Sequence, residues 1–473
     1  MSSFEDIRVE CERPYDYRLA LIWIFMNSIG EFAELRLEGK DASTRLNSLR
    51  KKLETRRATG PIPERRGEVS IHIHTCYSFS PYSPAEVVYG ALLTGLDAVG
   101  IIDHETISGC REMQDAARLI GLPITCGCEL RVSATGTRLE GRRINNPDSL
   151  NILYMVCHGI PRWNLPKFNA FLRPIRRARA ARMERQVAIL NEVLMNAGLM
   201  QLDYTADVES ISMNHQGGSI TERHILYALA RKMVARFGRG APLISALKLS
   251  LGLNVSTLAE ERLSDGENEH LLYDLLGVFK SVLVPSFYQE PSSEECLPVR
   301  RVCELVNDLG AIACYPYLGD VGESPTGDKK TESFEDSWLD ELFEELPRLG
   351  FRALTYMPPR NSIAQLGRVR ELCREKNLME ISGVDVNSSR QSFRCSELHQ
   401  QDFRHLNDSA WALIAHEYLS SYGGFGLFDL KSPLKTMTLK ERIKIYAGIG
   451  RRIDARRPER IVDIVREEGL WID

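Results

Sequence analysis

Residues 71–83 read IHIHTCYSFSPYS and place two histidines, His72 and His74, in an apolar, β-branched setting. Side chains two residues apart in a strand lie on the same face, so both imidazoles are expected to leave one strand in the same direction. Two further short apolar runs also end in potential ligands, the first at Asp103 and His104 and the second at Glu129. Ligands at the ends of successive strands indicate one metal site surrounded by strands.

From residue 67 onward, strand-like apolar segments alternate with helical segments. Near-continuous apolar strands separated by helices are typical of parallel strands covered by helices. This pattern predicts an α/β fold, either a closed barrel or an open doubly wound sheet. One helix start is explicit, because Ser83 can serve as an N-cap, a proline follows it, and Glu86 completes a capping box.

The alternation lapses from about residue 160 to 310, which we interpret as a helical insertion. Three parts are therefore expected: an N-terminal helical extension over residues 1–66, a barrel over 67–394 that contains the insertion, and a C-terminal helical extension over 395–473. The N-terminal part contains two predicted helices, 17–37 and 45–57. The breaker residues at 59–63 mark its boundary with the barrel.

One long helical pattern over residues 165–198 carries six arginines at helical spacing. They are Arg173, Arg176, Arg177, Arg179, Arg182 and Arg185. Arginines three and four residues apart share a face of a helix. We interpret them as a solvated stripe, and the alternative is that a few of them reach an anionic substrate.

Composition fits a soluble globular protein whose 473 residues allow two to four domains. The formal charge of -4 gives no support for a nucleic-acid or membrane partner, although nucleic acid stays an open alternative.

The N-terminal residues lack the basic and apolar regions of a signal peptide. The eleven cysteines are scattered and include no CxxC pair, which indicates reduced thiols and predicts a cytoplasmic protein.

The sequence resembles the polymerase and histidinol phosphatase (PHP) superfamily. The motifs that carry the resemblance are HIHTCYS at 72–78, IDHET at 102–106, GCE at 127–129, RHIL at 223–226, ACYP at 313–316 and SGVDVN at 382–387. The resemblance covers residues 69–387. It implies a distorted (β/α)7 barrel and a phosphoesterase that uses up to three divalent metal ions. The long gap between Glu129 and His224 is similar to the branch that acts on nucleotide and oligonucleotide phosphates.

The resemblance also implies a metal-ligand set. The first site would be complete, with the ligands His72, His74, Glu129 and Asp385. The second would use Glu129, His224 and the position of Tyr315, and the third would use His104 with the positions of Phe79 and Asn387. Phenylalanine cannot bind a metal ion and an amide oxygen is a poor zinc ligand, so we expect the third site to be empty. One or two ions of zinc, manganese or iron are expected.

Five cysteines lie near the expected site positions and offer substitute ligands, although small buried fillers are the favoured interpretation. They are Cys76, Cys126, Cys128, Cys157 and Cys314.

Catalytic roles follow from the same resemblance. His104 would act as a general acid or orient the leaving group, and Arg223 would hold the phosphate. His158 could replace the missing ligand of the second site or contact the substrate. Asp103 is expected to support its loop rather than bind metal. The expected activity is metal-dependent hydrolysis of a phosphomonoester or phosphodiester, with a phosphorylated small molecule or a nucleotide as substrate. The alternatives are a degenerate barrel that binds a ligand or partner without turnover, and single-metal hydrolysis of a non-phosphate bond.

Overall fold

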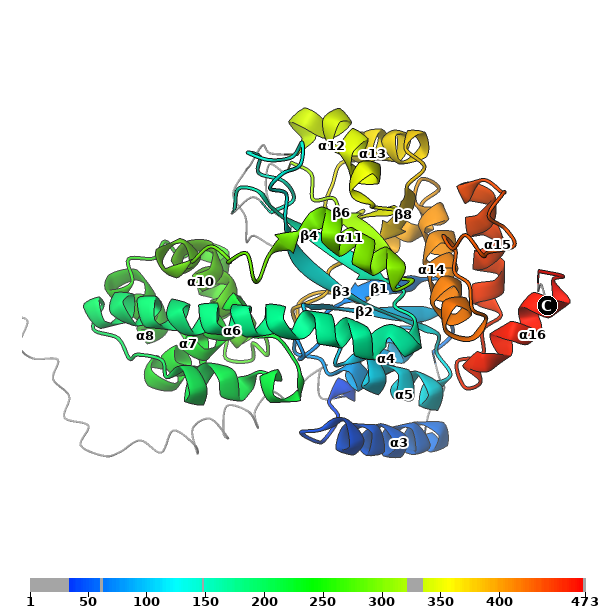
Figure 1. Ribbon diagram of the computed structural model, residues 1–473. Helices are drawn as coiled ribbons and strands as arrows, with labels where there is room; N and C mark the ends of the chain where they lie inside the picture. Colours follow the sequence, from blue (N-terminus) through cyan, green and yellow to red (C-terminus); the bar gives the residue numbers. More distant parts are fainter. Residues whose placement is uncertain (1–33, 60–62, 147–148, 321–334, 471–473) are drawn as a thin grey trace, which may run out of the picture.

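A single curved sheet forms the centre of the computed structural model, which describes residues 34–59, 63–146, 149–320 and 335–470 (Figure 1). Seven strands follow one another across the sheet in the order β1-β2-β3-β4-β6-β7-β8, and the short β5 pairs with the end of β3. The strands are β1 (Val69–Ile73), β2 (Ala98–His104), β3 (Ile124–Ser133), β4 (Ile152–His158), β5 (Leu297–Pro298), β6 (Ile312–Pro316), β7 (Ala353–Tyr356) and β8 (Met379–Ser382).

The sheet nearly closes on itself where the segment after β8 returns to β1. The amide of His74 donates to the carbonyl of Val386 at 2.8 Å, and the amide of Val386 donates to the carbonyl of His72 at 3.1 Å. These two hydrogen bonds form a parallel bridge between β1 and the segment after β8. The predicted α/β class, with a distorted seven-stranded barrel, is confirmed.

The direction of β4 differs from the prediction of parallel strands. β4 pairs antiparallel with both β3 and β6, with Val156 opposite Glu129 and His158 opposite Ile312. The described part of the 134–151 connection contains no helix. An antiparallel neighbour needs no crossover, whereas a parallel one does. The C-terminal end of β4 therefore lies beside the N-terminal ends of its neighbours, away from the edge where β2 ends.

Helices cover the outside of the barrel and its N-terminal end. The outer helices are α4 (Pro84–Leu93), α5 (Cys110–Ile120), α11 (Val299–Asp308), α12 (Leu339–Leu349) and α13 (Ile363–Glu375). The predicted capping box of α4 is present, since Ser83 Oγ accepts from the Glu86 amide and the Ser83 amide donates to Glu86. α14 (Arg404–Tyr422) is buried against residues of β1, β2, β4 and β6–β8, and α15 (Leu439–Arg451) and α16 (Ile461–Glu467) pack behind it.

At the N-terminal side, α3 (Ala42–Thr59) confirms the predicted second helix. Its Arg45 pairs with the buried Glu112 of α5, with Nε to Oε1 at 2.8 Å. The predicted helix at 17–37 lies almost entirely outside the described residues. No helix in the described ranges is both long and apolar enough to cross a membrane.

The insertion builds a second hydrophobic core beside the barrel (Figure 1). Its helices are α6 (Leu165–Asn196), α7 (Glu222–Phe237), α8 (Ala241–Ser245), α9 (Thr257–Ser264) and α10 (Leu271–Phe287). α6 belongs to both units, because Phe168 and Leu172 pack in the barrel core while Met183 and Leu190 pack in the insertion core. The insertion is therefore anchored by a helix that is continuous with the barrel.

The arginines of α6 are not a solvated stripe throughout. Arg173, Arg177 and Arg185 are exposed, but Arg176, Arg179 and Arg182 are buried, so the interpretation is wrong for these three. These three buried arginines lie on the face of α6 at the junction between the insertion and the barrel, where acidic side chains contact that face.

A buried arginine–glutamate network fills this junction. It consists of Arg131, Arg179, Arg182, Glu105, Glu222 and Glu295. Arg182 binds both oxygens of Glu295 at 2.7 Å and Glu222 at 2.9 Å. Burial alone would raise the pKa of Glu222, yet the three arginines hold it well below its usual range. Three positive and three negative groups balance, which is the condition for burying charge at tolerable cost.

Candidate metal centre

Three side chains converge inside the barrel: His72 on β1, His74 one residue beyond that strand, and the carboxylate of Glu129 on β3. Nε2 of His72 lies 3.7 Å from Glu129 Oε2, and Nε2 of His74 lies 3.9 Å from the same oxygen. Their ligand atoms all lie within 4.8 Å of one another. Both histidines are buried, so the cluster is held by the barrel rather than by a surface loop.

Asp385 joins this cluster from the segment after β8. Its Oδ1 lies 2.9 Å from His74 Nε2, and its backbone has φ 52°, which is unusual for a residue other than glycine. The hydrogen bonds between Val386 and β1 hold this strained turn beside His74. A β-carbon on Gly383 would come within 3.2 Å of His72 Nδ1, so glycine at this position lets the turn approach the ligand closely.

His104, at the end of β2, faces the same carboxylate. Its Nδ1 lies 3.7 Å from Glu129 Oε2, and its ring centre lies 4.6 Å from that of His74. Burial, with the neighbouring His74, lowers the pKa of His104 well below its usual range. A neutral imidazole is the form that binds a metal ion.

These residues fit a divalent metal ion. Among the described residues, His72 Nε2 and His104 Nδ1 are buried without a hydrogen-bond partner, and leaving a buried polar group unpaired costs about 1–3 kcal/mol. Two ligand atoms bound at about 2.0–2.2 Å to a tetrahedral ion are roughly 3.4 Å apart. The spacings of 3.7 and 3.9 Å around Glu129 are close to this value. An ion at the cluster would give each unpaired nitrogen a partner.

A second layer of hydrogen bonds fixes the loop after β1. Asp103 accepts from the amide and hydroxyl of Thr75 at 2.7 and 2.6 Å and from the hydroxyl of Ser78 at 2.7 Å. Ser78 Oγ also lies 3.4 Å from His74 Nδ1. The expectation that Asp103 supports the loop is confirmed. Sequence reasoning did not assign Ser78 this position, although it stands in the motif itself.

His224 lies outside the histidine–carboxylate cluster. Its Nδ1 accepts from the amide of Thr221 at 3.0 Å and so closes the N-terminus of α7, which leaves Nε2 as its only nitrogen for a metal. Its ring stands edge-on to Phe79, with the centres 5.0 Å apart. Burial and the charge of Arg179 lower the pKa of His224 to about 3. Its role as a ligand of a second site stays a prediction.

The three positions that depart from the family pattern have other partners. Phe79 packs in the insertion core, and the hydroxyl of Tyr315 donates to the buried Glu335. Asn387 donates to Asp385 Oδ1 at 2.9 Å and accepts from Arg223 Nη1 at 2.6 Å. Asn387 thus links Arg223 to a ligand of the first site, a connection that sequence reasoning missed.

His158 is buried on β4 but does not join the cluster. It lies two residues beyond Val156, which pairs with Glu129, and so toward the N-terminal ends of the neighbouring strands. Both of its ring nitrogens are buried without a hydrogen-bond partner among the described residues. Burial and the nearby His72 lower its pKa to about 3. Its catalytic assignment stays a prediction.

Four of the five cysteines near the site are buried, and Cys76 is partly buried. Burial raises the pKa of the thiols of Cys76, Cys128 and Cys314 well above the usual range, which disfavours the thiolate form. A metal ligand must be the thiolate, and this agrees with the filler interpretation.

Comparisons with known proteins agree with the motif assignment. Residues 70–235 match the model of the PHP domain family. A segment of 75 residues is 33% identical to a 5'-3' exoribonuclease of Haemophilus influenzae and covers 16% of this chain and 26% of that protein. The chain therefore matches about a quarter of the length of this relative.

Two solved structures resemble the chain at low identity. One, from Bifidobacterium adolescentis, is assigned as a metal-dependent phosphoesterase; it has a TM-score of 0.47 and 19% identity over 73% of this chain and 96% of that one. The other is an amidohydrolase from Chromobacterium violaceum with bound sulfate and no metal, with a TM-score of 0.45 and 16% identity over 68% and 88%. The segment that matches the PHP domain family begins on β1, ends in α7 and includes five predicted site histidines, namely His72, His74, His104, His158 and His224.

Proposed function

We propose that the protein is a metal-dependent phosphoesterase that hydrolyses a phosphomonoester or phosphodiester, nucleotides included. The observation that carries the proposal is the buried cluster of His72, His74 and Glu129, with Asp385 2.9 Å from His74. These four residues would hold the first ion, which can be zinc, manganese or iron. A divalent ion bound there supplies Lewis acidity, which makes water nucleophilic near neutral pH.

The chain's own residues divide the remaining work. Arg223, which donates a hydrogen bond to Asn387 beside Asp385, would bind phosphate oxygens through its planar guanidinium. His104, at the edge of the cluster, would orient or protonate the leaving-group oxygen. Ser78 and Asp103 keep His74 in position. His158 lies two residues beyond Val156, the strand partner of Glu129, and near His72; it would replace the missing ligand of the second site or contact the substrate.

A second ion would be bound by His224 Nε2 and Glu129. Its third ligand would be missing, because Tyr315 occupies the position where the family pattern has a metal ligand. A third ion is not expected, because Phe79 and Asn387 stand at two of its three ligand positions. The same replacements favour the alternative function, a barrel that binds a ligand without turnover. Metal content separates the two proposals, because ligands alone do not guarantee occupancy.

The test uses the full chain, stripped with a chelator and reloaded with manganese or zinc. Hydrolysis of 4-nitrophenyl phosphate, bis(4-nitrophenyl) phosphate, a 5'-mononucleotide and a short RNA would be measured, together with metal content. His72→Ala and Asp385→Asn should remove both bound metal and activity. His215→Ala, which changes an exposed histidine of the insertion, is the matched control and should change neither. Activity that survives both cluster substitutions would exclude the proposal, and less than about one tightly held ion per chain would favour the non-catalytic barrel.

A further inference from the structure

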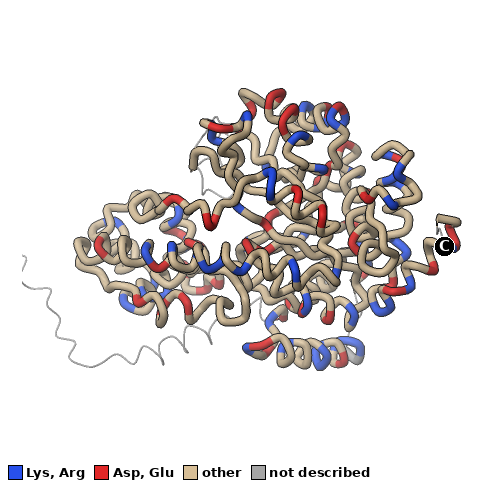
Figure 2. Tube along the Cα trace, viewed as in Figure 1, with Lys and Arg blue, Asp and Glu red and all other residues tan. Residues whose placement is uncertain are grey.

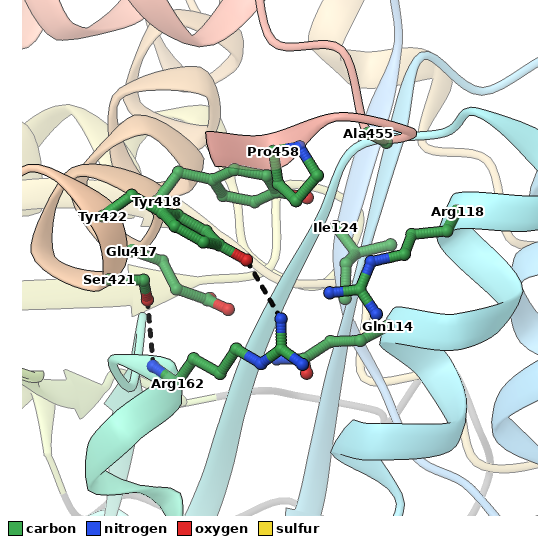
Figure 3. Close-up of a pocket in the computed structure, with 10 residues that line it drawn as sticks. All are labelled: Gln114, Arg118, Ile124, Arg162, Glu417, Tyr418, Ser421, Tyr422, Ala455 and Pro458. Atoms are coloured by element: carbon green, nitrogen blue, oxygen red, sulfur yellow. Dashed lines mark hydrogen bonds between the residues drawn. The ribbon is translucent and has the colours of Figure 1, made fainter. Parts of the chain in front are cut away.

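A small pocket lies at the end of the barrel opposite the metal centre, between α5, α14 and the segment before α16 (Figure 3). Its wall includes Ile124 at the start of β3, whereas the candidate ligand Glu129 is five residues further along, about 16 Å away at 3.3 Å per residue. The polar groups that line it are Gln114, Arg118, Arg162, Glu417, Tyr418, Ser421 and Tyr422. The pocket is therefore separate from the site described above.

Two guanidinium groups from different elements reach this pocket (Figure 3). Arg162 is held in place, because its Nη1 donates to the hydroxyl of Tyr422 at 3.1 Å and its amide donates to Ser421 Oγ at 2.9 Å. No carboxylate within the described ranges forms an ion pair with Arg162. Arg118 pairs with Asp115 of its own helix at 3.0 Å, a surface contact worth little. The pocket thus contains positive charge that is not fully neutralised.

Glu417 does not supply the missing negative charge. Its Oε2 accepts from the Thr125 hydroxyl and from the Cys126 amide, both at 2.7 Å. Burial raises the pKa of Glu417 to about 8, so the carboxyl group is mostly protonated near neutral pH. Its second oxygen can then donate a hydrogen bond. Glu417 therefore adds a donor to the pocket and leaves the arginines without a counter-charge.

We propose that this pocket binds a small oxyanion, a single phosphate or carboxylate group, between Arg118 and Arg162. Guanidinium groups bind such oxyanions through charge-assisted, often bidentate hydrogen bonds. Gln114 and the hydroxyl of Ser421 provide further neutral donors at the wall. The pocket is small and partly open to solvent, with Arg162 exposed at its mouth, so it suits one such group rather than a whole nucleotide. Because the pocket joins α5 to α14, a bound anion would stabilise the contact between barrel and C-terminal helices.

The test measures anion binding to full-length, chelator-treated protein, so that no ion at the metal centre holds the anion. Inorganic phosphate and succinate would each be titrated by calorimetry and by thermal unfolding in a buffer free of other oxyanions. One of the two should bind saturably at one per chain and raise the unfolding temperature. Arg162→Gln, which removes the charge but keeps a donor for Tyr422, should weaken that binding about tenfold or more.

Control variants make the outcome decisive. Arg185→Gln changes an exposed arginine of α6 and should bind as the unchanged protein does. Arg118→Gln is a second pocket variant and should also weaken binding if Arg162→Gln fails to fold. Absence of saturable binding by both anions would overturn the proposal, and so would binding that Arg118→Gln and Arg162→Gln leave intact. Binding that is lost in His72→Ala instead would place the anion at the metal centre and would also overturn it. None of these results depends on hydrolase activity.

Discussion

Replacing Arg182 by methionine should destabilise the protein by about 3–5 kcal/mol, the cost of breaking a buried ion pair from one side. The Arg182 side chain is 1% exposed. It donates two hydrogen bonds to Glu295, one to Glu222 and one to the carbonyl of Gln289. Methionine has a similar length but no donor, so the arginine–glutamate network would keep three carboxylates and only two guanidinium groups.

The matched control is Arg185→Met, three residues along the same helix. Arg185 is exposed and has one hydrogen bond, to Gln289 Oε1 at 3.3 Å. A surface change of this kind is usually worth less than about 0.5 kcal/mol. Urea unfolding followed by circular dichroism would compare the midpoints of both variants with that of the unchanged protein.

A double variant tests the physical reason. Adding Glu295→Gln to Arg182→Met restores the charge balance of the network, with two guanidinium groups and two carboxylates. The double variant should therefore recover part of the lost stability. If Arg182→Met shifts the midpoint no more than Arg185→Met does, or if the double variant recovers nothing, the network does not stabilise the junction as argued.

Three further changes test other parts of the structure. The pKa of Glu417 is about 8 when folded against 4.5 for an exposed glutamate, so the folded chain binds the proton more tightly and loses stability as the pH rises from about 4.5 to 8. Glu417→Gln removes this contribution, so the stability of the variant relative to the unchanged protein should rise between pH 5 and 8; a pH-independent difference would contradict the assignment. Ser78→Ala removes a polar contact of His74 and should weaken metal affinity about tenfold in a chelator competition, whereas unchanged affinity would show that the hydroxyl does not orient the ligand. Asn387→Ala frees Arg223 and should raise the KM for a phosphoester about tenfold; an unchanged KM would remove Arg223 from phosphate binding.

The local patterns of the sequence predicted much of the barrel and the candidate metal cluster. The strand expected around His72 is present as β1, and the capping box of α4 is where Ser83 and Glu86 indicated. Such features depend on residues a few positions apart, so a sequence displays them directly. His72 on β1 and His74 one residue beyond it both face Glu129, as their spacing indicated.

Features that depend on distant partners were not predictable in this way. The direction of β4 depends on its pairing with β3 and β6, and an apolar strand looks the same in either direction. The burial of Arg179 depends on Glu105 and Glu222, which lie 74 and 43 residues away. A helix with arginines on one face resembles an exposed helix until those acids are placed against it.

The hydrogen bonds between β1 and Val386 both close the barrel and hold the metal cluster together. The amide of His74 and the carbonyl of His72 both bond to Val386, next to Asp385. An ion that binds His72, His74 and Asp385 would therefore act as a clasp across the two ends of the sheet. Amide hydrogen exchange at His74 and Val386 should slow when metal is added, and this measures site occupancy without any substrate.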